Sequence, residues 1–152
     1  MNQTLLAFDY GERYIGIAVG NTETGIAHPA GHYEARHERE RYARAEALVQ
    51  EWRPGRLVVG LPVSSSGEER VITVRARRFG KQLAARTGLP VDMVDERLSS
   101  AAAEESLRAM GRGGRKHKEA SHALAAQLIL QAYLDEQKIG RGLSATRENS
   151  TP

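Results

Sequence analysis

The feature that most constrains the fold is an apolar run that ends in a carboxylate and resumes after a short polar link. Residues 5–8 are Leu, Leu, Ala and Phe, Asp9 follows them, and a second apolar run spans residues 15–19. A strand that is apolar on both faces belongs inside a sheet, where an ionised Asp is costly unless a cation, a base or water meets it. The pattern predicts a buried hairpin with Asp9 as a metal ligand or base, and an ordinary hairpin turn is the alternative.

Gly11 stands two residues after Asp9. Because glycine has no Cβ, the backbone at this position lets a phosphate or a metal-bound substrate approach closely, and it equally lets the chain turn. Gly11 is therefore a candidate substrate-binding residue, with a simple turn as the alternative.

The chain has 152 residues, no cysteine and a formal net charge of +3. This length suits one domain with a sizeable core, and the absence of cysteine excludes disulfides, thiolate zinc sites and a cysteine nucleophile. No segment resembles a signal peptide or a membrane span, so we expect a cytoplasmic protein with no membrane partner. The modest positive charge favours anionic partners.

Hydrophobic periodicity predicts a mixed α/β sheet with helices on its faces. Strands are expected at about 4–10, 14–20, 25–34, 57–61 and 91–94, and Pro29 makes the third of them the weakest. Helices are expected at about 36–52, 66–86, 100–110 and 119–136. A capping box, formed by Ser65 or Ser66 with Glu68 or Glu69, is expected to begin the second helix.

Acidic residues follow two of the apolar strands, at Asp9 and at Asp95-Glu96. In an open α/β sheet, groups beyond the carboxyl ends of parallel strands meet at one edge. Converging carboxylates repel each other unless a cation neutralises them, and oxygen ligands favour Mg²⁺ or Mn²⁺, the ions of phosphoryl transfer. The alternative for residues 95–97 is an exposed turn in which an acid pairs with Arg97.

Residues 111–118 are rich in glycine and basic residues and contain no acid. We expect a mobile loop whose cations contact nucleic-acid phosphates, which gives affinity without sequence choice. A solvated loop with no partner is the alternative. The candidate phosphate-binding residues are Arg112, Arg115, Lys116 and Lys118.

Four motifs occur in a fixed order: DYGERYIGIA at 9–18, VGLP at 59–62 with Gly67, DERLSS at 95–100, and AAQLILQAYL at 125–134. Together they resemble the YqgF family, also called RuvX, over residues 4–136. The resemblance implies a ribonuclease H-like fold, with a five-stranded mixed sheet, and a nuclease. The family has been described both as a Holliday junction resolvase, by similarity to RuvC, and as a nuclease that matures the 5′ end of pre-16S ribosomal RNA.

The resemblance assigns roles to individual residues. Asp9 matches the catalytic Asp of the first strand, and Glu96 matches the acid of the Asp-Glu-Arg motif. His122 stands where the family has a third acid, three residues before the Ala-Ala pair, and Ser99-Ser100 replace a Thr pair. A neutral imidazole can replace a carboxylate as a ligand and shifts preference toward Mn²⁺.

Two other roles for His122 stay open. It could act as a general acid or base, or as a cationic contact, at the scissile phosphate. Alternatively, the site has lost its third ligand and the protein is a weak nuclease or none.

The resulting hypothesis is a metal-dependent nuclease that hydrolyses phosphodiester bonds. One ion would generate hydroxide and a second would stabilise the leaving oxygen, with Asp9, Glu96 and His122 as catalytic residues and metal ligands. Arg97 would position the substrate phosphate or pair with a neighbouring acid. No chemistry is assigned to the other histidines, His28, His32, His37 and His117.

RNA is the favoured substrate, with a role in pre-16S rRNA maturation and ribosome biogenesis, and branched DNA is the alternative. A junction resolvase cuts two strands symmetrically and would act as a homodimer, whereas an RNA-trimming enzyme could be a monomer. The remaining alternatives are a non-catalytic RNA- or ribosome-binding module and a nucleotide-binding ATPase module, which would need two such domains. We expect one nuclease domain at 1–138 and a disordered tail at 139–152.

Overall fold

The computed structural model describes residues 3–63, 66, 68–96 and 115–148. Its centre is a five-stranded sheet in the order β3-β2-β1-β4-β5. The first three strands form antiparallel pairs, whereas β1 pairs in parallel with β4, and β4 with β5. This confirms the predicted mixed sheet, whose strands are β1 (Thr4–Asp9), β2 (Tyr14–Asn21), β3 (Ile26–Glu34), β4 (Arg56–Leu61) and β5 (Val91–Asp95).

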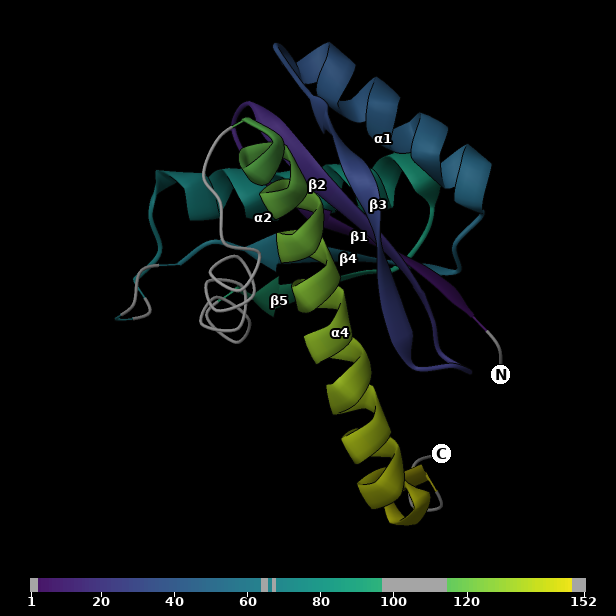
Figure 1. The fold of residues 1–152 in the computed structure, drawn as a ribbon. Helices are drawn as coiled ribbons and strands as arrows, with labels where there is room; N and C mark the ends of the chain where they lie inside the picture. The colour runs from purple at the N-terminus through teal and green to yellow at the C-terminus, as the bar shows by residue number, and fades with distance from the viewer. Residues whose placement is uncertain (1–2, 64–65, 67, 97–114, 149–152) are drawn as a thin grey trace.

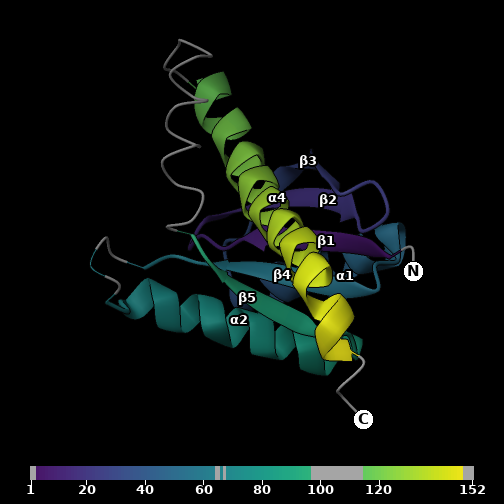
Figure 2. The same cartoon turned by 90° about the horizontal axis from the view of Figure 1, so that it is seen from below.

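Helices cover both faces of the sheet. Helix α4 crosses one face diagonally, and α1 and α2 pack on the other (Figures 1 and 2). None of the helices in the described ranges combines the length and apolar character needed to span a bilayer. The helices are α1 (Glu38–Trp52), α2 (Val71–Thr87) and α4 (Arg115–Glu148).

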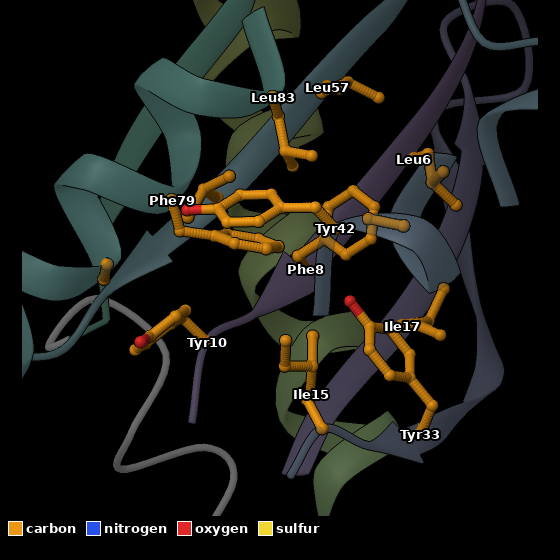
Figure 3. Packing of buried hydrophobic residues seen from close by; sticks show 14 of the residues in the cluster. Leu6, Phe8, Tyr10, Ile15, Ile17, Tyr33, Tyr42, Leu57, Phe79 and Leu83 are labelled. Carbon is orange, nitrogen blue, oxygen red and sulfur yellow. The ribbon is translucent and has the colours of Figure 1, made fainter. Parts of the chain in front are cut away.

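The face of the sheet under α1 and α2 is packed with aromatic rings. Phe79 of α2 lies 5.3 Å from Tyr10 and 5.6 Å from both Phe8 and Tyr42, measured between ring centroids (Figure 3). All four side chains are buried. Because side chains alternate along a strand, Phe8 and Tyr10 face this core and Asp9 faces α4.

The face under α4 contains several small residues beside larger aliphatic ones such as Leu5 and Val58. Ala7 and Ala18 of the sheet are fully buried beneath Ala126 of α4. At Gly16 of β2, an added Cβ would lie only 1.9 Å from the main-chain oxygen of His122. Helix α4 therefore approaches the sheet so closely that only glycine fits at position 16.

Helix α2 begins later than the sequence predicts. Ser66 lies in a turn, and Val63 and Glu69 form an isolated antiparallel bridge ahead of the helix. Thr73 Oγ1 accepts a hydrogen bond from the Arg70 amide at 3.0 Å and donates one to the Pro62 carbonyl. The predicted capping box at Ser66 is wrong because this bridge and Thr73, rather than a serine, define the start of the helix.

Helix α4 is longer than predicted at both ends. It begins at Arg115, so residues 115–118 are helical rather than part of a loop, and it continues to Glu148, into the segment predicted as a tail. The buried residues described on α4 end at Leu134. The helix expected at 100–110 lies outside the described residues, and the division into a domain at 1–138 and a tail stays a prediction.

Candidate active site

The carboxyl ends of the three parallel strands lie at one edge of the sheet. Asp9 is opposite Gly60 of β4, and Gly60 is opposite Val94 of β5. The Glu96 amide donates a hydrogen bond to the Leu61 carbonyl at 3.0 Å. The hydrogen bonding between β4 and β5 therefore continues one residue beyond Asp95, the last residue of β5. The predicted meeting of Asp9 and Glu96 at one edge is therefore observed.

Gly60 makes room for the Glu96 side chain. A Cβ at position 60 would lie 2.5 Å from Ile129 Cδ1 and 3.0 Å from Glu96 Cγ. Any other residue here would displace Ile129 of α4 or the glutamate. The glycine of the VGLP motif, on the neighbouring strand β4, thus leaves the space that the Glu96 side chain occupies.

The carboxyl groups of Asp9 and Glu96 are hydrogen-bonded to each other. Burial raises the pKa of Asp9, and the hydrogen bond from Glu96 and the nearby His122 oppose this rise. Burial, followed by the charge of Asp9 and the hydrogen bond to it, raises the pKa of Glu96 to about 9. At neutral pH the two acids therefore hold a proton between them, because two buried like charges cannot both ionise without a cation.

His122 lies beside this pair because α4 crosses β2 at Gly16. Its imidazole stacks on the Tyr14 ring at a centroid distance of 5.1 Å and an interplanar angle of 25°. Burial lowers the pKa of His122, the neighbouring His32 lowers it further, and Asp9 opposes both effects. The ring is neutral at neutral pH, the form in which a ring nitrogen can bind a metal.

His32 of β3 completes a cluster of three rings that sequence analysis missed. Its ring centroid lies 5.6 Å from that of His122 and 5.8 Å from that of Tyr14. His32 is opposite Gly16 in the strand register, which explains why it meets the helix there. The sequence contains no spacing that links residues 14, 32 and 122, so only the strand register could have revealed the cluster.

The acidic pair suits a divalent cation in its donor chemistry. Two carboxyl groups that already share a proton would bind a hard cation in its place. Within residues 3–63, 66, 68–96 and 115–148, however, no three His, Cys, Asp or Glu side chains converge closely enough to hold a metal ion. His122 as a third ligand stays a prediction.

The remaining predicted site residues are only partly placed. A Cβ at Gly11 would lie 2.3 Å from the Tyr14 carbonyl oxygen, so the tight turn accounts for this glycine, and substrate contact there stays a prediction. Arg97 and Arg112 lie outside the described residues. The backbones of Arg115, Lys116 and Lys118 form the start of α4, and their side chains lie outside the described part of the structure.

Known structures share this fold. A Thermus thermophilus RuvC chain in complex with a Holliday junction matches with a TM-score of 0.59 and 18% identity, over 89% of this chain and 95% of that one. At this identity the likeness shows the fold alone, which is the ribonuclease H-like fold expected from the sequence.

Sequence relatives are closer. A Methylobacillus flagellatus protein named "Putative pre-16S rRNA nuclease" is 46% identical over 131 residues, covering 86% of this chain and 90% of the relative. A Chromobacterium violaceum protein of the same name is 46% identical over 132 residues, covering 86% and 96%. The profile of the family described as "RuvX: Holliday junction resolvase" matches residues 3–136. The chain therefore belongs to the RuvX family.

Proposed function

We propose that this protein is a divalent-metal-dependent nuclease that hydrolyses phosphodiester bonds in RNA and matures the 5′ end of pre-16S rRNA. The observation that carries the proposal is the buried, hydrogen-bonded pair of Asp9 and Glu96 at the carboxyl edge of the sheet. The names of the sequence relatives support RNA as the substrate. The cytoplasm, where ribosomal RNA precursors are processed, is the proposed location.

Asp9 and Glu96 would hold Mn²⁺ or Mg²⁺, with His122 as the third ligand and Mn²⁺ favoured because of the imidazole. The bound metal would supply an activated water and stabilise charge on the leaving oxygen. The protein's own contribution is to bring two carboxyl groups together, to release their shared proton when the cation binds, and to hold a neutral imidazole beside them. Tyr14 and His32 fix the orientation of that imidazole by ring contact.

Substrate phosphates would be contacted by Arg97 and by the basic residues Arg112, Arg115, Lys116 and Lys118, with Gly11 giving space at the turn. Such contacts make binding strongly dependent on salt concentration. A monomer is sufficient for trimming RNA.

Resolution of branched DNA is the second candidate, and the description of the matching family favours it. A resolvase would act as a two-fold homodimer, since it must cut two strands symmetrically. A single cleavage assay separates the two candidates by their substrate.

The test is cleavage of labelled single-stranded RNA, single-stranded DNA and a four-way DNA junction in Mn²⁺ or Mg²⁺. We expect RNA cleavage that Asp9→Asn reduces by about a thousandfold or more, because a shared metal ligand is lost. Asp135→Asn is the matched control, because Asp135 is an exposed carboxylate on α4 that accepts a hydrogen bond from Gln131 and belongs to none of the predicted site residues. Cleavage of the junction alone would favour the resolvase, and no cleavage by the wild type, with metal-independent RNA binding, would favour a binding module.

The role of His122 needs its own comparison. If the imidazole is a ligand, His122→Asp should raise the Mg²⁺-dependent rate, and His122→Ala should lower the rate in either metal. An unchanged rate in both variants would exclude His122 as a ligand.

A further inference from the structure

A polar pocket lies on the opposite face of the sheet from Asp9, between the end of β1 and helices α1 and α2. Its volume is about 390 Å³, and three arginines line it: Arg41 of α1 with Arg75 and Arg78 of α2. Tyr10 also lines the pocket and directly follows Asp9 in the chain. The pocket therefore begins one residue from the proposed catalytic acid.

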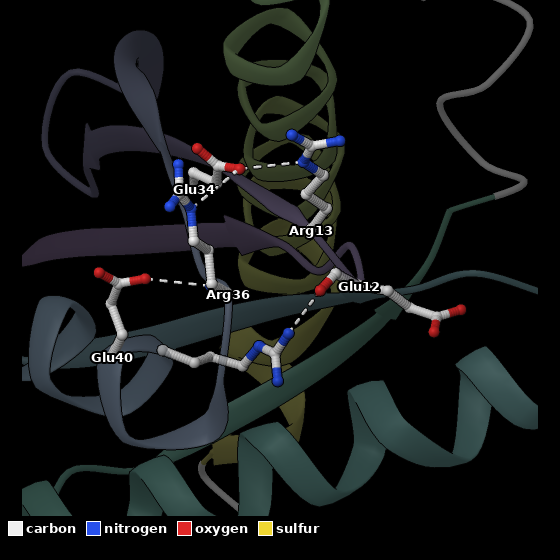
Figure 4. Close-up of polar contacts among 6 residues, drawn as sticks. Glu12, Arg13, Glu34, Arg36 and Glu40 are labelled. Carbon is white, nitrogen blue, oxygen red and sulfur yellow. Dashed lines mark hydrogen bonds and ion pairs between the residues drawn. The ribbon is translucent and has the colours of Figure 1, made fainter.

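Arg41 is an unusual component of this pocket because its side chain is only 9% exposed. Its Nη2 donates a hydrogen bond to the Glu12 carbonyl at 2.6 Å, the contact drawn to Glu12 in Figure 4, and its guanidinium lies 5.4 Å from the Tyr10 ring centroid. Its Nε is buried and has no hydrogen-bond partner among the described residues. The positive charge of Arg41 is costly to bury, and because Arg41 lines the pocket, an anion there would offset that cost.

The charges around Arg41 set the kind of anion that fits. Glu12 is paired with Arg75 at 2.5 Å, whereas Arg78 is exposed and forms no ion pair with any described residue. Glu38 also lines the pocket. Three arginines against two glutamates leave a small positive excess, which suits a singly charged phosphodiester better than a doubly charged phosphate monoester.

We propose that this arginine pocket binds a backbone phosphodiester of the substrate strand, next to the phosphate that is cleaved at Asp9. The inference rests on the proposed nuclease function for its substrate. Asp9 and Tyr10 point to opposite faces of the same strand end, so a nucleic-acid strand that passes over this edge meets both sites. The volume lies within the range of ligand-sized pockets, so a phosphodiester can enter with part of its sugar.

The test is the affinity of labelled single-stranded RNA for the full chain in EDTA, where no metal-dependent cleavage occurs. We expect Arg78→Glu to weaken binding about tenfold, and Arg78→Ala to reduce the slope of log affinity against log salt by about 0.7, the value for one phosphate contact on a single strand. The matched control is Arg39→Glu, the same charge reversal at an exposed position of α1 that does not line the pocket. Equal weakening by Arg78→Glu and Arg39→Glu, or no weakening by Arg78→Glu, would overturn the proposal.

Arg41→Lys keeps the charge but removes the planar guanidinium, and we expect it to weaken RNA binding as well. Circular dichroism of each variant shows whether the fold is intact, and Arg78 carries the test if the Arg41 variant does not fold. Competition by inorganic phosphate and by a dinucleotide separates the sources of phosphate. Displacement of RNA by the dinucleotide at lower concentration supports the proposal, and displacement by inorganic phosphate at an equal or lower concentration overturns it.

These results are independent of the nuclease assay. A pocket effect on RNA binding without any cleavage would reject the proposed catalysis and keep the pocket. Cleavage of RNA by Arg78→Glu with unchanged KM would reject the pocket and keep the catalysis.

Discussion

The two faces of the sheet are packed against their helices in different ways. Under α1 and α2, large rings such as Phe8 and Phe79 fill the space between helix and strand. Under α4, larger residues such as Leu5 also pack, but Ala7, Ala18 and Gly16 are small, and at Gly16 the helix backbone comes into direct contact with the strand. Aromatic packing tolerates a helix at some distance, whereas small residues bring main chain against main chain.

This difference explains where the acidic pair is found. A carboxyl group that must meet a partner from another element needs that element at a fixed, short distance. Asp9 and Glu96 both project toward α4, the closely packed side, while the ring-filled side contributes mainly apolar burial. The interface with α1 and α2 thus contributes mainly to stability, whereas the interface with α4 fixes the positions of the acidic side chains. Four substitutions test this difference.

Gly16→Ala is expected to have the largest effect. The new Cβ would lie 1.9 Å from the His122 carbonyl oxygen, and neither main chain can move without separating α4 from the sheet. We expect a loss of about 3 kcal/mol or more of unfolding free energy in urea denaturation. Gly31→Ala is the control, because Gly31 has a φ of 93° and no atom within 4 Å of its added Cβ, so backbone strain alone should cost roughly 1–2 kcal/mol. Equal losses in the two variants would show that the α4 contact is not specially tight.

Phe79→Leu tests the other face. Removing the ring leaves a cavity beside Phe8 and Tyr42, and we expect a loss of about 1–3 kcal/mol in the same urea experiment. The rate of RNA cleavage below the unfolding transition should stay near that of the wild type, because Phe79 touches neither acid. A large fall in kcat for a folded variant would show that the two faces are coupled.

Glu96→Gln should stabilise the metal-free protein at alkaline pH. The folded-state pKa of Glu96 is raised to about 9 from an ordinary value of 4.5, so the folded state binds more protons than the unfolded state between these pH values. As far as Glu96 is concerned, the unfolding free energy of the wild type is therefore highest below pH 4.5 and decreases as the pH rises toward 9. The glutamine amide does not ionise, so the variant lacks this decrease. Thermal unfolding in EDTA should show no gain at pH 5 and a gain of about 1–3 kcal/mol at pH 9. A gain that does not depend on pH would contradict the close approach of the two acids.

Tyr133→Phe is expected to have the smallest effect. Tyr133 lies on the α4 face but away from the acidic pair, and its hydroxyl donates a hydrogen bond to Asp92 Oδ2 at 2.5 Å. We expect a loss of about 1 kcal/mol in unfolding free energy and unchanged cleavage. A loss of activity would show that the whole α4 interface, rather than its end near Gly16, positions the site.

The sequence predicted the sheet because its signals are local. Apolar runs at 5–8, 15–19 and 57–61, separated by glycine, proline and polar links, define strands without knowledge of the tertiary structure. The start of α2 was predicted wrongly because the deciding contacts are not local: the bridge from Val63 to Glu69 and the hydrogen bond from Thr73 to Pro62 override a plausible serine cap.

The candidate site likewise contains residues that local sequence signals predict and residues that they do not. Asp9 and Glu96 could be predicted because each ends an apolar strand, and strand ends converge in this class of sheet. His122 was found only through the resemblance to a family. His32 and Arg41 could not be found, since His32 reaches the site through the register of β3 on β2, and the burial of Arg41 depends on how α1 packs over the turn at Glu12.

The contact at Gly16 separates the placement of α4 from the chemistry that it carries. The group of residue 122 nearest to position 16 is its main-chain oxygen, which every amino acid possesses, whereas its imidazole contacts the rings of Tyr14 and His32. The close main-chain approach at Gly16 therefore does not depend on which side chain residue 122 carries. A single codon change from histidine to aspartate would remove the ring contacts with Tyr14 and His32 and leave the main-chain contact at Gly16 in place.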